Sequence, residues 1–97
     1  MRAQRRFYRK MTYPDGAILE AVLWKLPAPT PDRPHGLKYR LYYGTADGST
    51  VVRYDNETGK GDHRHYGNRE EPYRFVDEAT LYADFMADVE RARRRRK

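Results

Sequence analysis

The 97-residue sequence has no cysteine and no long apolar run. The lack of cysteine excludes a disulfide framework and a thiolate zinc site, and it fits a reducing intracellular compartment. No apolar stretch approaches the roughly 20 residues that a membrane-spanning helix needs, and the basic N-terminus is not followed by the apolar core of a signal peptide. We therefore expect a soluble, cytoplasmic protein with no membrane contact.

Acidic residues are missing from both ends of the chain, where basic residues gather. Residues 1–10 contain five basic side chains and residues 91–97 contain six, so the body between them is net acidic although the whole chain carries +6. Basic ends of this kind suit phosphate backbones, because each neutralised phosphate releases counterions. They equally suit solvated tails, or cations near a helix C-terminus. Both interpretations stay open.

The chain has the length of a single domain, which we assign to residues 1–97 with one core. At 38% hydrophobic and 13% aromatic residues the sequence is too apolar to be wholly disordered, whereas its 35% charged residues predict a strongly solvated surface. We expect a thin core that is rich in tyrosine.

The first third of the chain predicts β-strands. Residues 4–13 form a polar strand that ends at the proline and glycine turn of residues 14–16. Residues 17–26 are apolar on both faces of a strand, which predicts a central position in the sheet. Residues 27–36 contain four prolines, which cannot donate to a strand ladder, so we expect an exposed crossing loop.

The middle of the chain predicts two more strands. In residues 37–43 polar and apolar side chains alternate, so that Lys38, Arg40 and Tyr42 share one face and leave an apolar face opposite. The polar face could contact phosphates and a stacked base, or it could be only the solvated side of the sheet. After a turn, residues 50–55 form a strand that should pair antiparallel with the previous one.

The last third of the chain predicts one short strand and one helix. Residues 72–76 form a fourth or edge strand. Residues 77–94 form an amphipathic helix with Asp77 as its N-cap. Its apolar side chains recur at four-residue spacing, as Leu81, Phe85 and Val89. The predicted fold class is therefore α+β, an antiparallel β-sheet meander of four to five strands packed by one C-terminal α-helix.

Residues 54–66 form the most polar stretch of the body, and we interpret them as a loop that carries function. Gly59 and Gly61 flank Lys60, so the backbone could approach an anion closely while the lysine reaches it. The spacing is not that of a nucleotide-binding P-loop, and Gly-Lys-Gly alone is a weak signal.

His63 and His65 share a face if this segment is extended, with Asp62 and Arg64 on the other face. Three uses stay open. In a metal-independent ribonuclease the histidines exchange protons with the ribose 2′-hydroxyl and the leaving 5′-oxygen, while a nearby cation stabilises the phosphorane. In a metal site they are joined by Asp55 or Asp62. In the third case they only hydrogen-bond the loop to itself.

Two other polar positions have simpler interpretations. His35 stands apart in the sequence, and it either folds back toward the histidine pair or is an ordinary turn residue. Asp55 and Asn56 close their strand, and we expect their side chains to shape the next turn rather than to take part in catalysis.

Several motifs occur together between residues 11 and 90. They are His35-Gly36-x-Lys38-Tyr39-Arg40-Leu41, Arg53-Tyr54-Asp55-Asn56, Gly59-Lys60-Gly61-Asp62-His63-Arg64-His65, Pro72-Tyr73-x-Phe75, and a helix with Leu81, Asp84 and Phe85. In this combination the chain resembles the TumE family of prokaryotic toxin–antitoxin toxins. The resemblance implies a small toxin encoded beside a DNA-binding antitoxin that neutralises it by direct binding. It supports a toxin component more strongly than any particular reaction.

These observations together predict a toxin that acts on RNA as a metal-independent endoribonuclease. The catalytic candidates are His63, His65 and Lys60. The candidates for nucleic-acid binding are Arg64, Lys38, Arg40, Tyr42 and Arg53. We assign no metal ligand and expect no cofactor; the expected partners are RNA and the cognate antitoxin, and a homodimer stays open. The alternative is a non-catalytic RNA- or ribosome-binding module or a protein-interaction domain, although uncharged histidines bind phosphate weakly.

Overall fold

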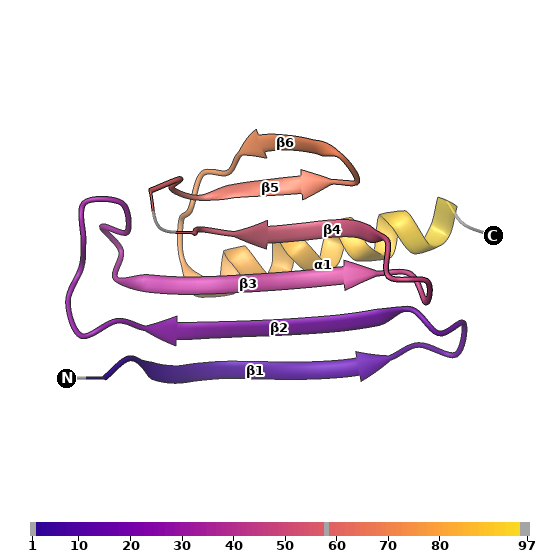
Figure 1. The fold of residues 1–97 in the computed structure, drawn as a ribbon, viewed down its shortest axis with the longest axis horizontal. Helices are drawn as coiled ribbons and strands as arrows, with labels where there is room; N and C mark the ends of the chain where they lie inside the picture. Colours follow the sequence, from indigo (N-terminus) through magenta and orange to yellow (C-terminus); the bar gives the residue numbers. More distant parts are fainter. Residues whose placement is uncertain (1, 58, 96–97) are drawn as a thin grey trace.

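The computed structural model describes residues 2–57 and 59–95. One antiparallel sheet lies against one helix, so the predicted α+β class is confirmed (Figure 1). The elements are β1 (Gln4–Thr12), β2 (Ile18–Lys25), β3 (Leu37–Gly44), β4 (Thr50–Asp55), β5 (His63–Tyr66), β6 (Arg69–Pro72) and α1 (Glu78–Arg95). The strands follow in the order β1-β2-β3-β4-β5-β6, which is the predicted meander. The predicted number of four to five strands is wrong, because the sheet has six.

Strand β5 lies where we predicted a loop. Residues 54–66 begin inside β4 and end with β5, so that only the residues between Asp55 and His63 connect strands. The strand predicted at residues 72–76 is also wrong, since β6 ends at Pro72. The cause is the two-residue turn Gly67-Asn68, which folds β5 and β6 into a hairpin although neither strand is apolar.

The position of β2 also differs from the prediction. It lies between β1 and β3, next to the edge rather than at the centre of the sheet. Helix α1 covers one face only, and it lies behind β3 and β4 in Figure 1. The β2 side chains on the covered face are buried, whereas Trp24 on the open face is half-buried in the monomer. A homodimer therefore stays an open alternative.

The core forms between α1 and the covered face of the sheet. Leu81, Phe85 and Val89 of α1 are buried as predicted. The ring of Tyr54 packs edge-on against Phe85 at 5.8 Å and against Tyr73 at 5.0 Å between ring centroids. The expected tyrosine-rich core is therefore present. None of the helices in the described residues is long and apolar enough to span a membrane.

Polar contacts hold α1 in register with the sheet. At its start Asp77 accepts a hydrogen bond of 2.7 Å from the Thr80 amide, which confirms the predicted N-cap. Asp88 is buried and accepts hydrogen bonds from the hydroxyl groups of Tyr54 and Tyr66. The sequence analysis did not foresee this acid, because one aspartate within a charged helix gives no signal of burial.

The basic ends of the chain belong largely to regular elements. Near the N-terminus, Arg5, Arg6, Arg9 and Lys10 lie on β1, whereas Arg2 precedes it. At the other end Arg93 donates to the Tyr43 hydroxyl at 2.8 Å and stacks over the ring of Tyr13 at 3.8 Å. These cations sit in the last turn of α1, where they favour its C-terminus. Residues Met1, Thr58, Arg96 and Lys97 lie outside the described residues.

Asn56 ties the end of β4 to the start of β3. Its side chain is 1% exposed, donates to the Leu37 carbonyl at 2.8 Å and accepts from the Tyr39 amide at 3.1 Å. The backbone carbonyl of Asn56 also accepts a hydrogen bond from Arg33. Asn56 therefore has a structural role, as expected, through hydrogen bonds to the start of β3.

We predict that Asn56→Ala lowers the free energy of unfolding by about 1–3 kcal/mol, because it leaves two buried backbone groups without partners. The matched control is Glu57→Ala at the exposed neighbouring position, which should stay within about 0.5 kcal/mol of the parent. Urea unfolding of the three proteins measures both values. Equal stability of the two variants would contradict this role for Asn56.

Candidate active site on the open face of the sheet

The face of the sheet away from α1 carries two polar rows that cross the strands. Residues paired across antiparallel strands share a face, so the register defines these rows. One row runs Tyr8, Val22, Arg40, Asp55, His63, Pro72, and the other runs Lys10, Glu20, Tyr42, Arg53, His65, Glu70. The register thus brings both histidines together with two carboxylates and an arginine.

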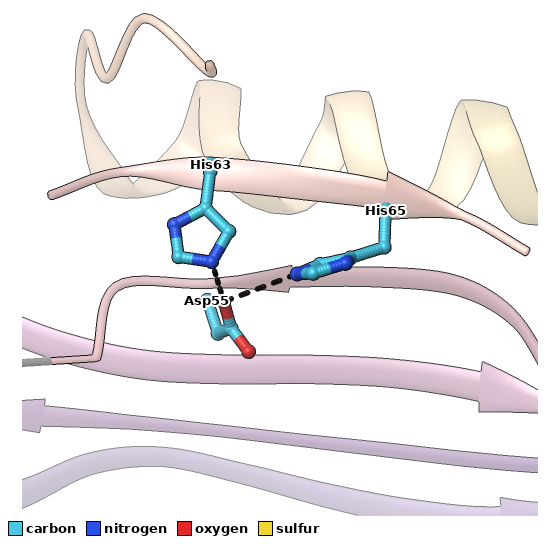
Figure 2. Close-up of side chains that lie close together, drawn as sticks. All are labelled: Asp55, His63 and His65. Atoms are coloured by element: carbon cyan, nitrogen blue, oxygen red, sulfur yellow. Dashed lines mark ion pairs between the residues drawn. The ribbon is translucent and has the colours of Figure 1, made fainter. Parts of the chain in front are cut away.

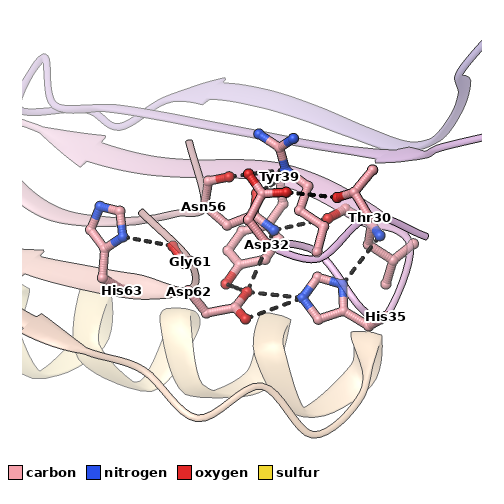
Figure 3. Close-up of polar contacts among 10 residues, drawn as sticks. Thr30, Asp32, His35, Tyr39, Asn56, Gly61, Asp62 and His63 are labelled. Atoms are coloured by element: carbon pink, nitrogen blue, oxygen red, sulfur yellow. Dashed lines mark hydrogen bonds and ion pairs between the residues drawn. The ribbon is translucent and has the colours of Figure 1, made fainter. Parts of the chain in front are cut away.

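His63 is buried, and both of its ring nitrogens face oxygen atoms. Nδ1 lies 2.9 Å from the Gly61 carbonyl oxygen, to which it donates (Figure 3). Nε2 lies 2.8 Å from Asp55 Oδ1 (Figure 2). It also lies 3.0 Å from Glu70 Oε2. Because carboxylates only accept, these Nε2 contacts are favourable when the nitrogen carries a proton or meets a cation. With Nδ1 already donating, the geometry fits an imidazolium.

His65 lies beside His63 in a different environment. The two ring centroids are 5.0 Å apart. Arg53 Nη2 lies 3.0 Å from His65 Nε2, and because a guanidinium has no lone pair to offer, Nε2 is the acceptor. Burial and then the nearby charge of Arg53 lower the pKa of His65 below its usual value. His65 Nε2 thus offers its lone pair to Arg53, and it lies farther than His63 Nε2 from Asp55 Oδ1 and Glu70 Oε2, at 3.8 and 3.5 Å.

Asp55 connects the two histidines to Arg53. It is 3% exposed, and its Oδ2 lies 3.0 Å from Arg53 Nε. Neither Asp55 Oδ1 nor Arg53 Nε has a hydrogen-bond partner of good geometry. Asp55, His63 and His65 each offer one ligand atom within 4.8 Å of the others, a set that a divalent cation could use. The cluster can thus take up either a proton or a metal ion.

Two hollows open beside the histidine pair. Arg53 and His65 line one of about 540 Å³, together with residues of the β3–β4 and β5–β6 turns. His63 lines the other, of about 360 Å³, together with Lys60 and Glu70. Each histidine therefore has its own opening to solvent.

Lys60 lies in the connection between β4 and β5, between two glycines with positive φ. Gly59 has φ of 85° and Gly61 of 73°, which residues with a side chain rarely adopt. This turn exposes Lys60 and aims the Gly61 carbonyl at His63. The structure thus brings Lys60 together with the predicted histidine.

Four of the predicted nucleic-acid-binding residues also lie on the open face, namely Lys38, Arg40, Tyr42 and Arg53. Arg40 stands opposite Asp55 and Tyr42 opposite Arg53 in the β3–β4 register. The Arg40 guanidinium lies 5.1 Å from the centroid of the Tyr42 ring. This basic and aromatic surface is continuous with the histidine pair.

Arg64 is the one nucleic-acid candidate that the structure sets apart. It occupies the covered face of β5, where its Nε lies 2.8 Å from Glu71 Oε1 and its Nη1 donates to the Tyr54 hydroxyl at 3.2 Å. It also lies against the rings of Tyr54, Tyr66 and Tyr73. These contacts give Arg64 a packing role beneath the sheet.

His35 does not join the histidine pair. Its Nε2 lies 3.0 Å from Asp62 Oδ1, and its Nδ1 accepts a hydrogen bond from the Leu37 amide (Figure 3). The Tyr39 hydroxyl donates to the same Asp62 oxygen at 2.6 Å, and burial and this bond raise the pKa of Tyr39. The contacts anchor the segment that carries Gly61, so His35 positions His63 only indirectly.

Glu70 is the member of the cluster that sequence reasoning missed. It lies on β6, opposite His65 in the β5–β6 register. The available signal was Gly67-Asn68, a sequence suited to a two-residue hairpin loop. Counting back from that turn pairs Tyr66 with Arg69 and therefore His65 with Glu70.

Comparison with known proteins assigns the chain to a family. The family model described as Toxin TumE matches residues 2–93, which is nearly the whole chain. The chain belongs to the TumE toxin family. This membership supports a toxin role and implies an antitoxin partner. No curated protein and no solved structure matches the chain.

We predict that the pKa of His65 lies below 6.5 in this TumE toxin and rises in Arg53→Ala, because that change removes a neighbouring positive charge. NMR titration of the imidazole protons measures both values. Arg94→Ala, a charge removed from α1 on the opposite side of the sheet, should leave the pKa unchanged. A lower or unchanged pKa in Arg53→Ala would contradict the assigned contact.

Proposed function

We propose that this toxin acts on RNA and cleaves it as a metal-independent endoribonuclease at the open face of the sheet. One observation carries the proposal. His63 has an Nε2 that fits a protonated state, and His65 has an Nε2 that offers a lone pair, with ring centroids 5.0 Å apart. Phosphodiester cleavage by the ribose 2′-hydroxyl needs one proton donor and one proton acceptor, and the pair supplies one of each.

In the proposed reaction, the phosphate of the substrate draws Arg53 away from His65, which frees the Nε2 lone pair. His65 Nε2 takes the proton of the 2′-hydroxyl, and the 2′-oxygen attacks phosphorus. Arg53 stabilises the negative charge of the phosphorane from the side of His65, and Lys60 from the side of His63. As the bond from phosphorus to the 5′-oxygen breaks, the proton on His63 Nε2 passes to that oxygen. The products are a 2′,3′-cyclic phosphate and a 5′-hydroxyl.

The carboxylates have a supporting role in this mechanism. Asp55 lies against His63 on one side and Arg53 on the other, so its charge favours the protonated imidazole and orients the guanidinium. Glu70 adds a second negative charge near His63 Nε2. The two carboxylates thus lie on either side of the His63 nitrogen that gives up the proton.

The same face offers a path for the RNA strand beyond the scissile bond. Lys38 and Arg40 are exposed beside the site and can neutralise neighbouring phosphates. The Tyr42 ring is half-buried and can stack on a base together with the Arg40 guanidinium. The need for a 2′-hydroxyl selects RNA over DNA.

A second candidate is a metal-dependent activity of the same cluster. It is favoured by the convergence of ligand atoms from Asp55, His63 and His65 within 4.8 Å. A bound cation would replace the proton on His63 and activate a water molecule instead of the ribose hydroxyl. Against it stands Arg53, whose guanidinium contacts the His65 nitrogen that the metal would need.

We predict that the parent protein cleaves RNA in the presence of a chelator. His63→Ala and His65→Ala should each lower the rate by about 10²–10⁴, because each removes one partner of the proton transfer. Lys60→Ala should also slow cleavage by removing a cation near the phosphorane. A gel assay with a labelled oligonucleotide measures the rates.

The control variant Arg94→Ala removes a positive charge from α1, on the other side of the sheet, and should keep the parent rate. Melting temperatures of all variants separate lost activity from lost structure. Activity that disappears with the chelator would move the assignment to the metal site. Histidine variants that cleave like the parent would refute the catalytic proposal, and an inert parent that still binds RNA would leave the non-catalytic binding module.

A further inference from the structure

The two edges of the sheet differ most in the length of strand that they offer for pairing. At one edge, β6 has four residues and ends at Pro72, and a short, charged strand with a proline pairs poorly with other chains. At the other edge, β1 has nine residues, and its pairing with β2 is regular from Phe7 to Thr12, after a register shift between Arg5 and Phe7. It pairs with β2 on one side, and within residues 2–57 and 59–95 no strand pairs with its other side. A row of its N–H and C=O groups is therefore available for an added strand.

The side chains of β1 add an apolar contact to this open edge. Phe7 is 39% exposed and Tyr8 is 46% exposed, on opposite faces of the strand. A groove of about 260 Å³ runs between β1 and the first turns of α1. Its lining is mostly apolar, formed by Phe7, Leu23, Leu41, Leu81 and Tyr82, with the ion-paired Arg6 and Glu78. The groove lies on the covered face of the sheet beside Phe7, the face to which alternate side chains of an added strand would point.

The charge of β1 restricts what can pair with it. From Arg2 to Thr12 the chain carries five basic residues and no acidic one. A second copy of β1 would set basic residues against each other, which destabilises strand pairing. RNA would match the charge, but its phosphates could not donate to the backbone carbonyl groups or fill an apolar groove. An acidic protein segment with apolar residues can pair with the backbone groups of β1, contact the apolar groove and match the basic charge.

We propose that β1 binds an acidic, extended segment of a partner protein as a seventh strand, with one apolar side chain in the groove beside Phe7. Because the TumE family implies an antitoxin, that partner is the antitoxin. The inference does not depend on RNA cleavage. With adjacent strands about 4.8 Å apart, β1 lies roughly 19 Å from β5, so the added strand itself leaves the histidine pair uncovered.

Hydrogen–deuterium exchange of the full chain tests the proposal through the backbone amides. The chain is measured alone, in the complex co-purified with the antitoxin, and with synthetic peptides that tile the antitoxin sequence. We expect the amides of Gln4–Thr12 to exchange more slowly in the complex and with one acidic peptide, because strand addition protects the outward N–H groups. That peptide alone should leave RNA cleavage unchanged.

Two variants separate specific pairing from general attraction. Arg5→Glu, and Arg5→Glu combined with Phe7→Ser, should weaken binding of the acidic peptide, the double variant by about tenfold or more, since it loses both the charge and the apolar anchor. Arg94→Glu is the matched charge reversal at the far end of α1 and should bind like the parent. Melting temperatures verify folding, and the single variant keeps the test valid if the double variant does not fold.

Three results would overturn the proposal. One is a dimer of the chain alone with its β1 amides protected, which would assign the edge to self-association. Another is protection of β1 by an RNA oligonucleotide without the antitoxin. The third is an antitoxin complex in which β1 stays unprotected, which would place the antitoxin elsewhere on the molecule.

Discussion

The pairing of β4 with β5 is the constraint on which the candidate site depends. It sets Asp55 opposite His63 and Arg53 opposite His65. Strand β5, whose sequence is typical of a polar loop, therefore contributes both histidines of the charged cluster. A shift of one residue would send the histidines to the face beneath α1 and bring Arg64 to the open face. Register, more than any single hydrogen bond, therefore decides the chemistry available to this chain.

Side chains rather than long ladders hold this register. The Asn56 side chain accepts a hydrogen bond from the Tyr39 amide of β3. Asp62 of the β4–β5 connection contacts His35 of the proline-rich loop and accepts a hydrogen bond from Tyr39 of β3. On the covered face, Arg64 lies among three tyrosine rings. These contacts favour the register in which Arg64 points toward α1 and the histidines point to the open face. Buried polar groups of this kind are costly when unpaired, so each contact favours one alignment of the short strand.

Much of the fold and part of the site could be predicted from the sequence. Apolar and polar side chains alternate in β3, which identified a strand with one buried face. Leu81, Phe85 and Val89 recur every four residues, which identified a helix with one buried face. Strand β5 could not be found this way, because its stability comes from pairing and not from apolar side chains. Glu70 was missed for the same reason, since its place near the histidines follows from the β5–β6 turn.

The ends of the RNA products test the central claim most directly, because they record which oxygen attacked phosphorus. Mass spectrometry of a cleaved oligonucleotide should show a 2′,3′-cyclic phosphate and a 5′-hydroxyl, and a 2′-deoxy substitution at the cleaved position should abolish the reaction. Products with a 3′-hydroxyl and a 5′-phosphate, formed equally well from the deoxy substrate, would mean that water attacks. That result would contradict the assignment of His65 as the acceptor of the ribose proton.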